Sequence, residues 1–249
     1  MGTAGCLAAR YAEGVRGLLV RVGIDQAYGG WNAPVDPETF EFAYVPIPDG
    51  EQHAELATPY EQVLDAVARF PDSRLPDSLR GRAMHLDPDF EHLTYGDVGT
   101  RRGRGASRLE AGDFIAFYSS LRPTRPAAHT LVYALIGFYR VQNVAWVGAI
   151  PRDQWRENAH TRRVDASPSD IVVRAQPGVS GRLLRCIPIG EYRDRSYRVR
   201  RELLAEWGPL SCRDGFLQRS AVPPSFQSPE RFLSWLDAQR PELVAANNP

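Results

Sequence analysis

The chain has 249 residues, of which 43% are hydrophobic and 24% charged, and its 30 basic residues balance 30 acidic ones to give zero net charge. This composition is typical of a globular protein, and a neutral chain is not one that coats DNA by general electrostatic attraction. The sequence contains no lysine, which excludes Schiff-base lysine catalysis and a P-loop lysine. Any clamp for a phosphate or carboxylate must therefore use arginine or backbone amides.

Targeting and redox features indicate a cytoplasmic protein. No apolar run approaches the roughly 20 residues of a membrane-spanning helix, and the N-terminus lacks the features of a signal peptide. The cysteines Cys6, Cys186 and Cys212 form no CxxC pair. The sequence therefore predicts neither a disulfide framework nor a zinc ribbon, and Cys186, within an apolar run, is expected in the core.

Residues 1–17 are expected to form an N-terminal extension, followed by a single domain over 18–249. The apolar run 18–24 and the segment 40–47 are predicted strands. Between them, residues 25–37 are rich in Gly, Asn, Asp and Pro, which predicts a loop.

A capping box, Thr58-Pro-Tyr-Glu61, predicts a helix that Pro71 ends. Residues 71–111 are expected to be mostly irregular, and a segment of this length without regular structure is usually functional or mobile.

The second half of the chain is expected to hold most of the sheet. The predicted strands are 113–118, a run over 130–147 that forms two strands or one sharply bent strand, 171–175 and 182–189. The predicted helices are a short one over 150–155, one over 196–207, and a last one that Ser228-Pro229 caps. The helices over about 191–249 form the C-terminal part of the domain.

Six or more strands with few helices between them do not predict a doubly wound sheet. We expect an α+β fold built on a strongly curved mixed β-sheet or small β-barrel with peripheral helices.

A polar segment, His85-Leu-Asp-Pro-Asp-Phe-Glu-His92, places two imidazoles and three carboxylates within eight positions. In an extended chain His85, Asp87 and Asp89 would point to one side, which suits acid/base chemistry or a divalent ion. Pro88 favours a turn instead, in which the carboxylates cap nearby backbone amides. We predict a catalytic or substrate-binding role without a cofactor, and binding of a divalent metal by His85, Asp87 and Asp89 is the alternative left open.

Two other loops carry candidate site residues. The segment Thr94-Tyr-Gly-Asp97 predicts a turn in which Tyr95 stacks on a base and Asp97 accepts from its exocyclic amine, or else an ordinary tight turn. Asp25 leaves the first predicted strand ahead of Gln26 and the pair Gly29-Gly30, and acids and glycines in this position often face a ligand. The alternative is that Asp25 caps the loop and the glycines form a tight turn.

Polar groups in the second half complete the candidate set. His160, in Asn158-Ala-His160 with Arg162 close behind, has the pKa range of a proton shuttle, although Asn158 could merely end the short helix. The loop over 176–181, with Ser180 and then Arg182, could hold a phosphate through backbone amides and a guanidinium.

Two segments resemble the core of the PUA-like superfamily, which includes the ASCH and EVE domains. They are Gly112-Asp-Phe-Ile-Ala-Phe-Tyr118 and Leu131-Val-Tyr-Ala-Leu-Ile-Gly-Phe-Tyr-Arg-Val141. In that superfamily a Gly-Asp turn opens a strand that ends in an aromatic residue, and the next strand carries an Ile-Gly step. The resemblance implies a PUA-like form for the curved sheet.

Further segments, in chain order over about 18–190, are similar to the nucleotide modification associated domain 3 family. They are Arg21-Val-Gly-Ile-Asp25, Ile47-Pro-Asp49, the polar residues from His85 to Asp97, Asn158-Ala-His160 and Gly178-Val-Ser-Gly-Arg-Leu-Leu184. The resemblance implies a role in systems that make, elaborate or recognise hypermodified DNA bases. It also places Asp49 among the candidate substrate-binding residues.

We therefore expect a DNA base modification enzyme that acts by hydrolysis or hydration on a modified base, in DNA or as its nucleotide. The candidate general bases are Asp25, Asp87 and Asp97, and the candidate proton donors are His85 and His160. The residues expected to stack on the base are Trp31, Tyr95 and Tyr118. The expected partners are nucleic acid with a flipped modified base and other components of a base-modification system, and no membrane. A reader that binds the flipped base without chemistry is the alternative.

Overall fold

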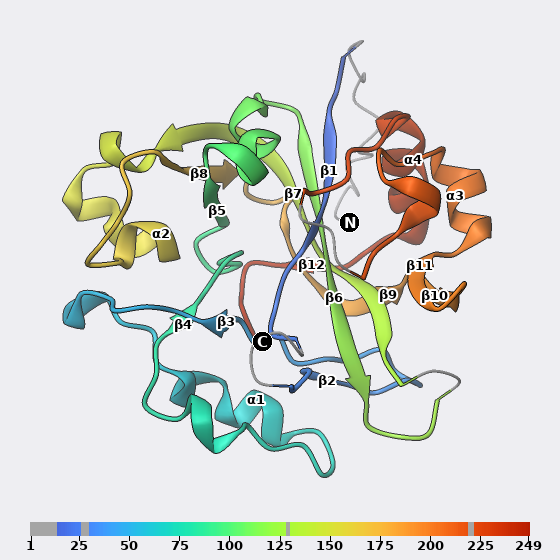
Figure 1. The fold of residues 1–249 in the computed structure, drawn as a ribbon, viewed down its shortest axis with the longest axis horizontal. Helices are drawn as coiled ribbons and strands as arrows, with labels where there is room; N and C mark the ends of the chain where they lie inside the picture. The colour runs from blue at the N-terminus through green and yellow to red at the C-terminus, as the bar shows by residue number, and fades with distance from the viewer. Residues whose placement is uncertain (1–13, 26–29, 128–129, 219–221) are drawn as a thin grey trace, which may run out of the picture.

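The structure is a computed structural model that describes residues 14–25, 30–127, 130–218 and 222–249. An eight-stranded sheet runs through it (Figure 1). The strands are β1 (Gly17–Arg21), β2 (Pro34–Val35), β5 (Thr94–Val98), β6 (Phe114–Pro123), β7 (Val132–Trp146), β8 (Asp170–Ala175), β9 (Gly181–Pro188) and β12 (Leu243–Val244). Their order is β1-β6-β7-β8-β5, with β2 also pairing β6 and β9 pairing both β7 and β12. Strands β1 and β2 run parallel to β6, and the other pairs are antiparallel.

The long strand β7 joins the two halves of the sheet. Its first part pairs with β6 and β9, and its last part, from Val141 to Trp146, pairs with β8. The ladder with β8 shifts register between Val141 and Asn143, and a shift of this kind bends a strand. The run over 130–147 is therefore largely one strand with an irregular register, one of the two forms that the sequence allowed.

The mixed α+β class is confirmed, but the barrel form is not observed. Within the described ranges the strand order ends at β1 on one side and β5 on the other, and these two strands do not pair. The PUA-like shape of the sheet remains a prediction.

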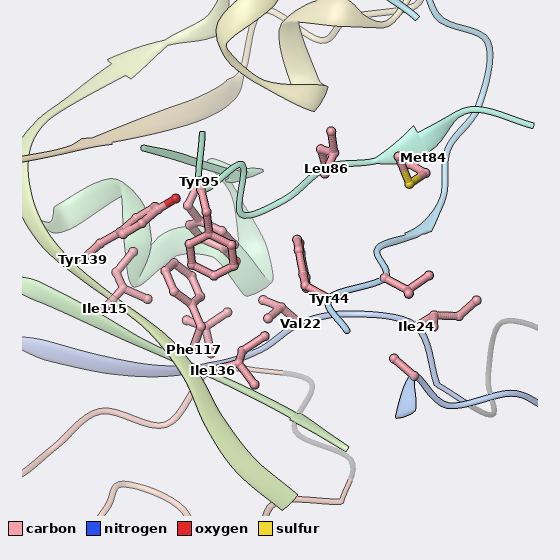
Figure 2. Packing of buried hydrophobic residues seen from close by; sticks show 14 of the residues in the cluster. Val22, Ile24, Tyr44, Met84, Leu86, Tyr95, Ile115, Phe117, Ile136 and Tyr139 are labelled. Carbon is pink, nitrogen blue, oxygen red and sulfur yellow. The ribbon is translucent and has the colours of Figure 1, made fainter. Parts of the chain in front are cut away.

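Alternation along β6 builds a hydrophobic core on each face of the sheet. Ile115 and Phe117 point to one core, which Figure 2 shows together with Tyr139 from β7. Phe114 and Tyr118 point to the other core. Helices α3 (Arg201–Trp207) and α4 (Pro229–Gln239) cover that second face, and in Figure 1 they lie side by side next to β6 and β7.

The other elements are short and surround the sheet. The remaining strands are β3 (Ile47–Pro48), which pairs with β4 (Met84–His85), and β10 (Gly190–Arg193), which pairs with β11 (Ser196–Val199). The remaining α-helices are α1 (Leu64–Ala68) and α2 (Ala159–Arg162). The 3₁₀ turns are η2 (Ala54–Leu56), η3 (Tyr60–Val63), η4 (Asp77–Leu79), η5 (Arg101–Arg104), η6 (Ala106–Arg108), η7 (Val147–Ala149), η8 (Arg152–Glu157) and η9 (Arg213–Gly215).

The predicted strand over 40–47 is wrong. It makes one isolated bridge, between Phe42 and Val35, and its residues 42–45 are all buried instead of alternating. The C-terminal tail replaces a neighbouring strand here, because the side chain of Asn248 accepts from the backbone N–H of Tyr44 and donates to its carbonyl, both at 2.8 Å. A side chain 204 positions away leaves no local pattern in the sequence.

The predicted helix over 196–207 is half correct. Its first residues form β11, because Asp194 and Arg195 adopt positive φ angles of 52° and 61° that close a tight hairpin with β10. The ring of Tyr197 then stacks on that of Tyr133, with centroids 4.3 Å apart. Only the later residues form α3.

The capping box is also wrong, although a helix does follow it. The Thr58 hydroxyl donates to the carbonyl of Met84, and the Glu61 carboxylate accepts from the N–H of Gly81. These side chains therefore tie the start of the helix to β4 and to the segment just before it, instead of capping the first turn.

Candidate functional site

A cavity of about 360 Å³ opens between the end of β1, strand β5 and helix α2. Its lining consists of Arg21, Val22, Gly23, Asp25, Ile47, His85, Asp87, Tyr95, Gly96, Asp97 and His160. All five residues that the sequence nominated as catalytic, Asp25, His85, Asp87, Asp97 and His160, are in this lining. They come from three separate parts of the chain, around residue 25, over 85–97 and at residue 160, and the fold brings these parts together.

His85 is positioned by the pairing of β3 with β4. Ile47 lies opposite His85 in that ladder, so the turn after β3 puts Asp49 behind the imidazole, where its Oδ2 is 3.2 Å from Nδ1. Asp49 is itself held by Gln52 at 2.8 Å and by Arg163 at 2.7 Å. Burial raises the pKa of Asp49, but the hydrogen bonds and charges of His85, Gln52 and Arg163 outweigh it and hold this pKa well below its usual range. Asp49 thus stays ionised and orients His85.

His160 lies in the first turn of α2, on the opposite wall. Asn158 caps this helix by accepting from the His160 backbone N–H at 2.9 Å. The Nδ1 atom of the imidazole is 2.6 Å from Oδ2 of Asp170, the first residue of β8. Burial lowers the pKa of His160, but its hydrogen bond with Asp170 and the negative charges of Asp87 and Asp170 raise it to about 9.

Asp87 lies between the two imidazoles. Its Oδ1 accepts from the Gly96 N–H at 2.5 Å and from the Asn158 amide at 3.3 Å. These bonds leave Oδ2 facing Nε2 of His85 and Nε2 of His160, each at 3.6 Å. A continuous row of alternating carboxylates and imidazoles results, in the order Asp49, His85, Asp87, His160, Asp170.

Strand β5 supplies a further carboxylate to the cavity. The phenol of Tyr95 donates to Oδ2 of Asp97 at 3.0 Å. Burial, with the charge of Asp87, raises the pKa of Asp97, whereas burial keeps the pKa of Tyr95 well above its usual value. The carboxyl of Asp97 therefore binds a proton more readily than an exposed aspartate does, while Tyr95 remains a donor that orients it.

Gly96 sets the distance between β5 and α2. A Cβ atom at this position would lie 2.3 Å from Cδ2 of His160 and 2.6 Å from Oδ1 of Asn158. Glycine is therefore what lets the helix approach the strand closely enough for His160 and Asp87 to meet.

The wall at the end of β1 carries a cation. Arg21 is 2.8 Å from Oδ2 of Asp25 and 3.1 Å from the hydroxyl of Ser120, and it also donates to the carbonyl of Gln218. Its guanidinium lies 5.5 Å from the ring centroid of Tyr133. The cavity is therefore bounded by a fixed positive group on one side and by the carboxylate–imidazole row on the other.

Some nominated residues support the cavity or lie away from it. Asp49 and Asn158 stand behind His85 and Asp87 and do not line the cavity. Trp31 packs against the core of the first sheet face, and Gly30 has a positive φ of 73° but is not in the lining. Gln26 and Gly29 lie outside the described residues.

The prediction that Asp89 shares a site with His85 and Asp87 is wrong. Strand β4 ends at His85, so the alternation does not continue, and Asp89 points into a separate buried cluster. There Oδ2 of Asp89 is 2.5 Å from Arg162 and 3.0 Å from Nδ1 of His92. Arg162, only 1% exposed, is thereby a structural residue with no access to substrate.

Three further nominated residues, Tyr118, Ser180 and Arg182, lie outside the cavity lining. Tyr118 is fully buried on the second sheet face, where it donates to the carbonyl of Leu217. Ser180 is buried and accepts from the backbone N–H of Arg140. The Arg182 guanidinium donates to backbone carbonyls and lies 3.8 Å from the ring centroid of Phe42, so packing and backbone contacts hold it away from this cavity.

Sequence reasoning missed Arg21, the cation on the cavity wall, and it also missed the residues that orient the imidazoles. Arg21 belongs to a segment that carries the family resemblance, and its position four residues before Asp25 is the signal that could have identified it. Asp170 and Gln52 lie in segments without a distinctive pattern. Only the pairing of strands and the packing of α2 reveal what they do.

A sequence model described as nucleotide modification associated domain 3 matches residues 16–213. This span contains every residue of the cavity lining and both outer carboxylates, and it ends before α4. No curated protein and no solved structure matches the chain. None of the helices in the described ranges is long and apolar enough to cross a membrane.

Proposed function

We propose, because this chain belongs to the nucleotide modification associated domain 3 family, that it modifies a nucleobase by water-dependent chemistry in the cavity of His85, Asp87, Asp97 and His160. The substrate is a modified base, either in DNA or as its nucleotide. The family links the chain to nucleotide modification, and the reaction is inferred from the site.

One observation carries this proposal: four titratable side chains from three separate segments converge on a single cavity. A volume of about 360 Å³ lies in the range of small-molecule sites, roughly 300–1,000 Å³. A nucleobase flipped out of a helix needs a site of this kind, because its reactive atoms are inaccessible in the stack.

The cavity offers complementary groups for recognising a base. A carboxylate such as Asp97 accepts from an exocyclic amine, and in its protonated form, which the raised pKa favours, it also donates to a ring nitrogen or carbonyl. Arg21 on the opposite wall can donate to a carbonyl or a phosphate. Tyr95 does not offer a free stacking face, because its ring packs against Phe117 with centroids 5.4 Å apart.

The reaction that best suits this site is hydrolysis. The oxygen of a water molecule forms a bond to an electrophilic carbon of the base or its substituent, and the bond from that carbon to the leaving nitrogen or oxygen breaks. The proton lost by water passes to the row of His85, Asp87 and His160. The leaving atom takes up a proton from Asp97 or from the same row, so charge and atoms balance.

A direct test compares three proteins on one substrate panel. Wild type, Asp87→Asn and the control Asp165→Asn, an identical change at an exposed position, are incubated with DNA and nucleotides whose bases carry extra amino, hydroxymethyl or amide substituents. The digested nucleosides are then analysed by mass spectrometry. We expect a change in mass with wild type and Asp165→Asn and none with Asp87→Asn.

Two results would overturn the proposed hydrolase activity. A change in mass that persists in Asp87→Asn would show that the chemistry occurs elsewhere. Tight binding of one modified base without any change in mass would identify a reader instead of an enzyme.

A further inference from the structure

We propose that His85, Asp87 and His160 bind a divalent transition-metal ion of the zinc class. One ligand atom from each side chain lies within 4.8 Å of the others. The three side chains are 9%, 6% and 6% exposed, so they are largely shielded from bulk water while still lining the cavity. The inference deepens the proposed function, on which its chemical role rests, but metal binding can be tested separately.

Hydrogen bonds at the outer nitrogens direct the lone pairs of both imidazoles to the same point. Asp170 accepts from Nδ1 of His160 at 2.6 Å, so Nε2 is the nitrogen left with a lone pair in the neutral ring. Asp49 likewise accepts from Nδ1 of His85 at 3.2 Å, which leaves the lone pair on Nε2 of that ring. Arg163 approaches that Nδ1 at 3.4 Å, but the carboxylate contact is shorter and charge-assisted and therefore fixes the tautomer.

The distances between the inner atoms fit a shared ion better than hydrogen bonds. Both Nε2 atoms are 3.6 Å from Oδ2 of Asp87, which is too long for a hydrogen bond between nitrogen and oxygen. Around a tetrahedral zinc ion with ligands at about 2.0–2.1 Å, neighbouring ligand atoms are roughly 3.3 Å apart. Each imidazole nitrogen lies at nearly this spacing from the carboxylate oxygen, and all three atoms lie within 4.8 Å of one another, so a cation between them could contact all three.

The surroundings of the cluster resemble the outer layer of a metal site. Ligating histidines usually donate their other N–H to a carboxylate, which fixes the ring and strengthens the ligand. Asp49 and Asp170 each do this here, and the second oxygen of Asp87 is held by the Gly96 N–H and Asn158. Partners outside the cluster therefore orient each of the three ligands.

Three protein ligands leave a coordination position for water, as in catalytic zinc sites. Bound zinc would lower the pKa of such a water to about 7, which supplies the nucleophile that the proposed hydrolysis needs. With His85, Asp87 and His160 serving as ligands, Asp97 in the same lining would accept the proton of that water and return it to the leaving atom. Two histidines and one carboxylate also bind iron(II) in oxygenases, but hydrolysis requires no oxidant, and the zinc class is the one that suits it.

The test is a titration of chelator-treated protein with Co²⁺, followed by visible absorption, and with Zn²⁺, followed by calorimetry. We expect one equivalent of each ion to bind to wild type and a Co²⁺ spectrum typical of four-coordination. Asp87→Asn and His160→Gln should remove this binding, and Asp170→Asn, which only orients His160, should weaken it about 10- to 100-fold. His53→Gln, outside the cluster, should bind as wild type does, and circular dichroism verifies that each variant is folded.

The inference is overturned if the metal-free wild type binds neither ion, or if folded Asp87→Asn and His160→Gln bind as tightly as His53→Gln. Its failure is distinguishable from that of the proposed function. Base conversion by protein kept in excess chelator would reject the metal and retain the enzyme, whereas one bound equivalent without any base conversion would retain the metal and reject the enzyme.

Discussion

Asp170→Asn is the substitution whose effect the structure defines most closely. It removes the charge that faces Nδ1 of His160 at 2.6 Å and leaves the shape of the side chain almost unchanged. In protein freed of metal, the imidazolium of His160 is stabilised by Asp170 and Asp87 against the penalty of burial. Without Asp170, only one carboxylate opposes the effect of burial, and the pKa of His160 should fall toward its ordinary value.

The magnitude follows from the linkage between protonation and folding. The pKa of His160 is about 9 in the folded chain, against an ordinary value of 6.5, and each unit corresponds to about 1.4 kcal/mol. Because the folded pKa is raised, the stabilisation is fully present below about pH 6.5 and is lost as the pH rises through about 9. The stabilisation that the raised pKa of His160 contributes is on the order of 3 kcal/mol, and Asp170→Asn should remove at least half of it.

The assay is urea unfolding of metal-free protein at intervals from about pH 6 to about pH 10. The free energy of unfolding of Asp170→Asn should lie about 2 kcal/mol below that of wild type at the acidic end, and the difference should narrow toward the alkaline end. The free energy of unfolding of the control Asp165→Asn, at an exposed position in the loop before β8, should run parallel to that of wild type. A constant difference between Asp170→Asn and wild type across this range would refute the reasoning.

Three further substitutions or modifications test the structure. Gly96→Ala should lower the free energy of unfolding by about 1–3 kcal/mol and shift the imidazole NMR signals of His160, because the new Cβ would lie 2.3 Å from that ring. Arg162→Ala should cost about 3–5 kcal/mol in urea unfolding, because it leaves the Asp89 carboxylate buried without the guanidinium that contacts it at 2.5 Å. Cys186 should resist alkylation at about pH 8 until the protein is unfolded, since burial raises its pKa to about 12, as mass spectrometry of the labelled peptide can show.

Matched controls separate these effects from general sensitivity to mutation. A Cβ at Gly105 would meet Leu18 at 3.6 Å, an ordinary contact, so Gly105→Ala should leave both stability and the His160 signals unchanged. Arg156→Ala removes an exposed arginine that donates to the carbonyl of Glu55 and should change stability by less than about 0.5 kcal/mol. Equal losses in a test variant and its control, or rapid labelling of Cys186 in the folded protein, would contradict the packing described above.

Local sequence patterns were sufficient to predict several of the regular strands and helices. The apolar run that contains β1 and the alternation in β6 are visible in the sequence, and Pro229 correctly marks the start of α4. Segments whose backbone bonds to scattered partners instead of one neighbouring strand were not predictable. The stretch 40–47 reads as a strand, yet Ala43 donates to Pro34, Val45 accepts from Ile24, and Tyr44 bonds to the side chain of Asn248.

The candidate site was predictable residue by residue but not as an arrangement. Clusters of acids and imidazoles, together with the order of the family-like motifs, nominated His85, Asp87, Asp97 and His160, and all four lie in the cavity lining. The sequence grouped Asp89 with them because alternate residues share a face in an extended chain. The end of β4 breaks that alternation, and Asp170, which the sequence did not mark, faces His160 instead.

The most direct measurement of the proposed chemistry is to run the reaction in water enriched in ¹⁸O and to weigh the nucleoside product. Wild-type protein should place one ¹⁸O atom in the product base, or in the group released from it, and Asp87→Asn should yield unlabelled starting material. A modified product that carries no ¹⁸O in either fragment would contradict the account, because the oxygen would then not have come from a water activated at His85, Asp87 and His160.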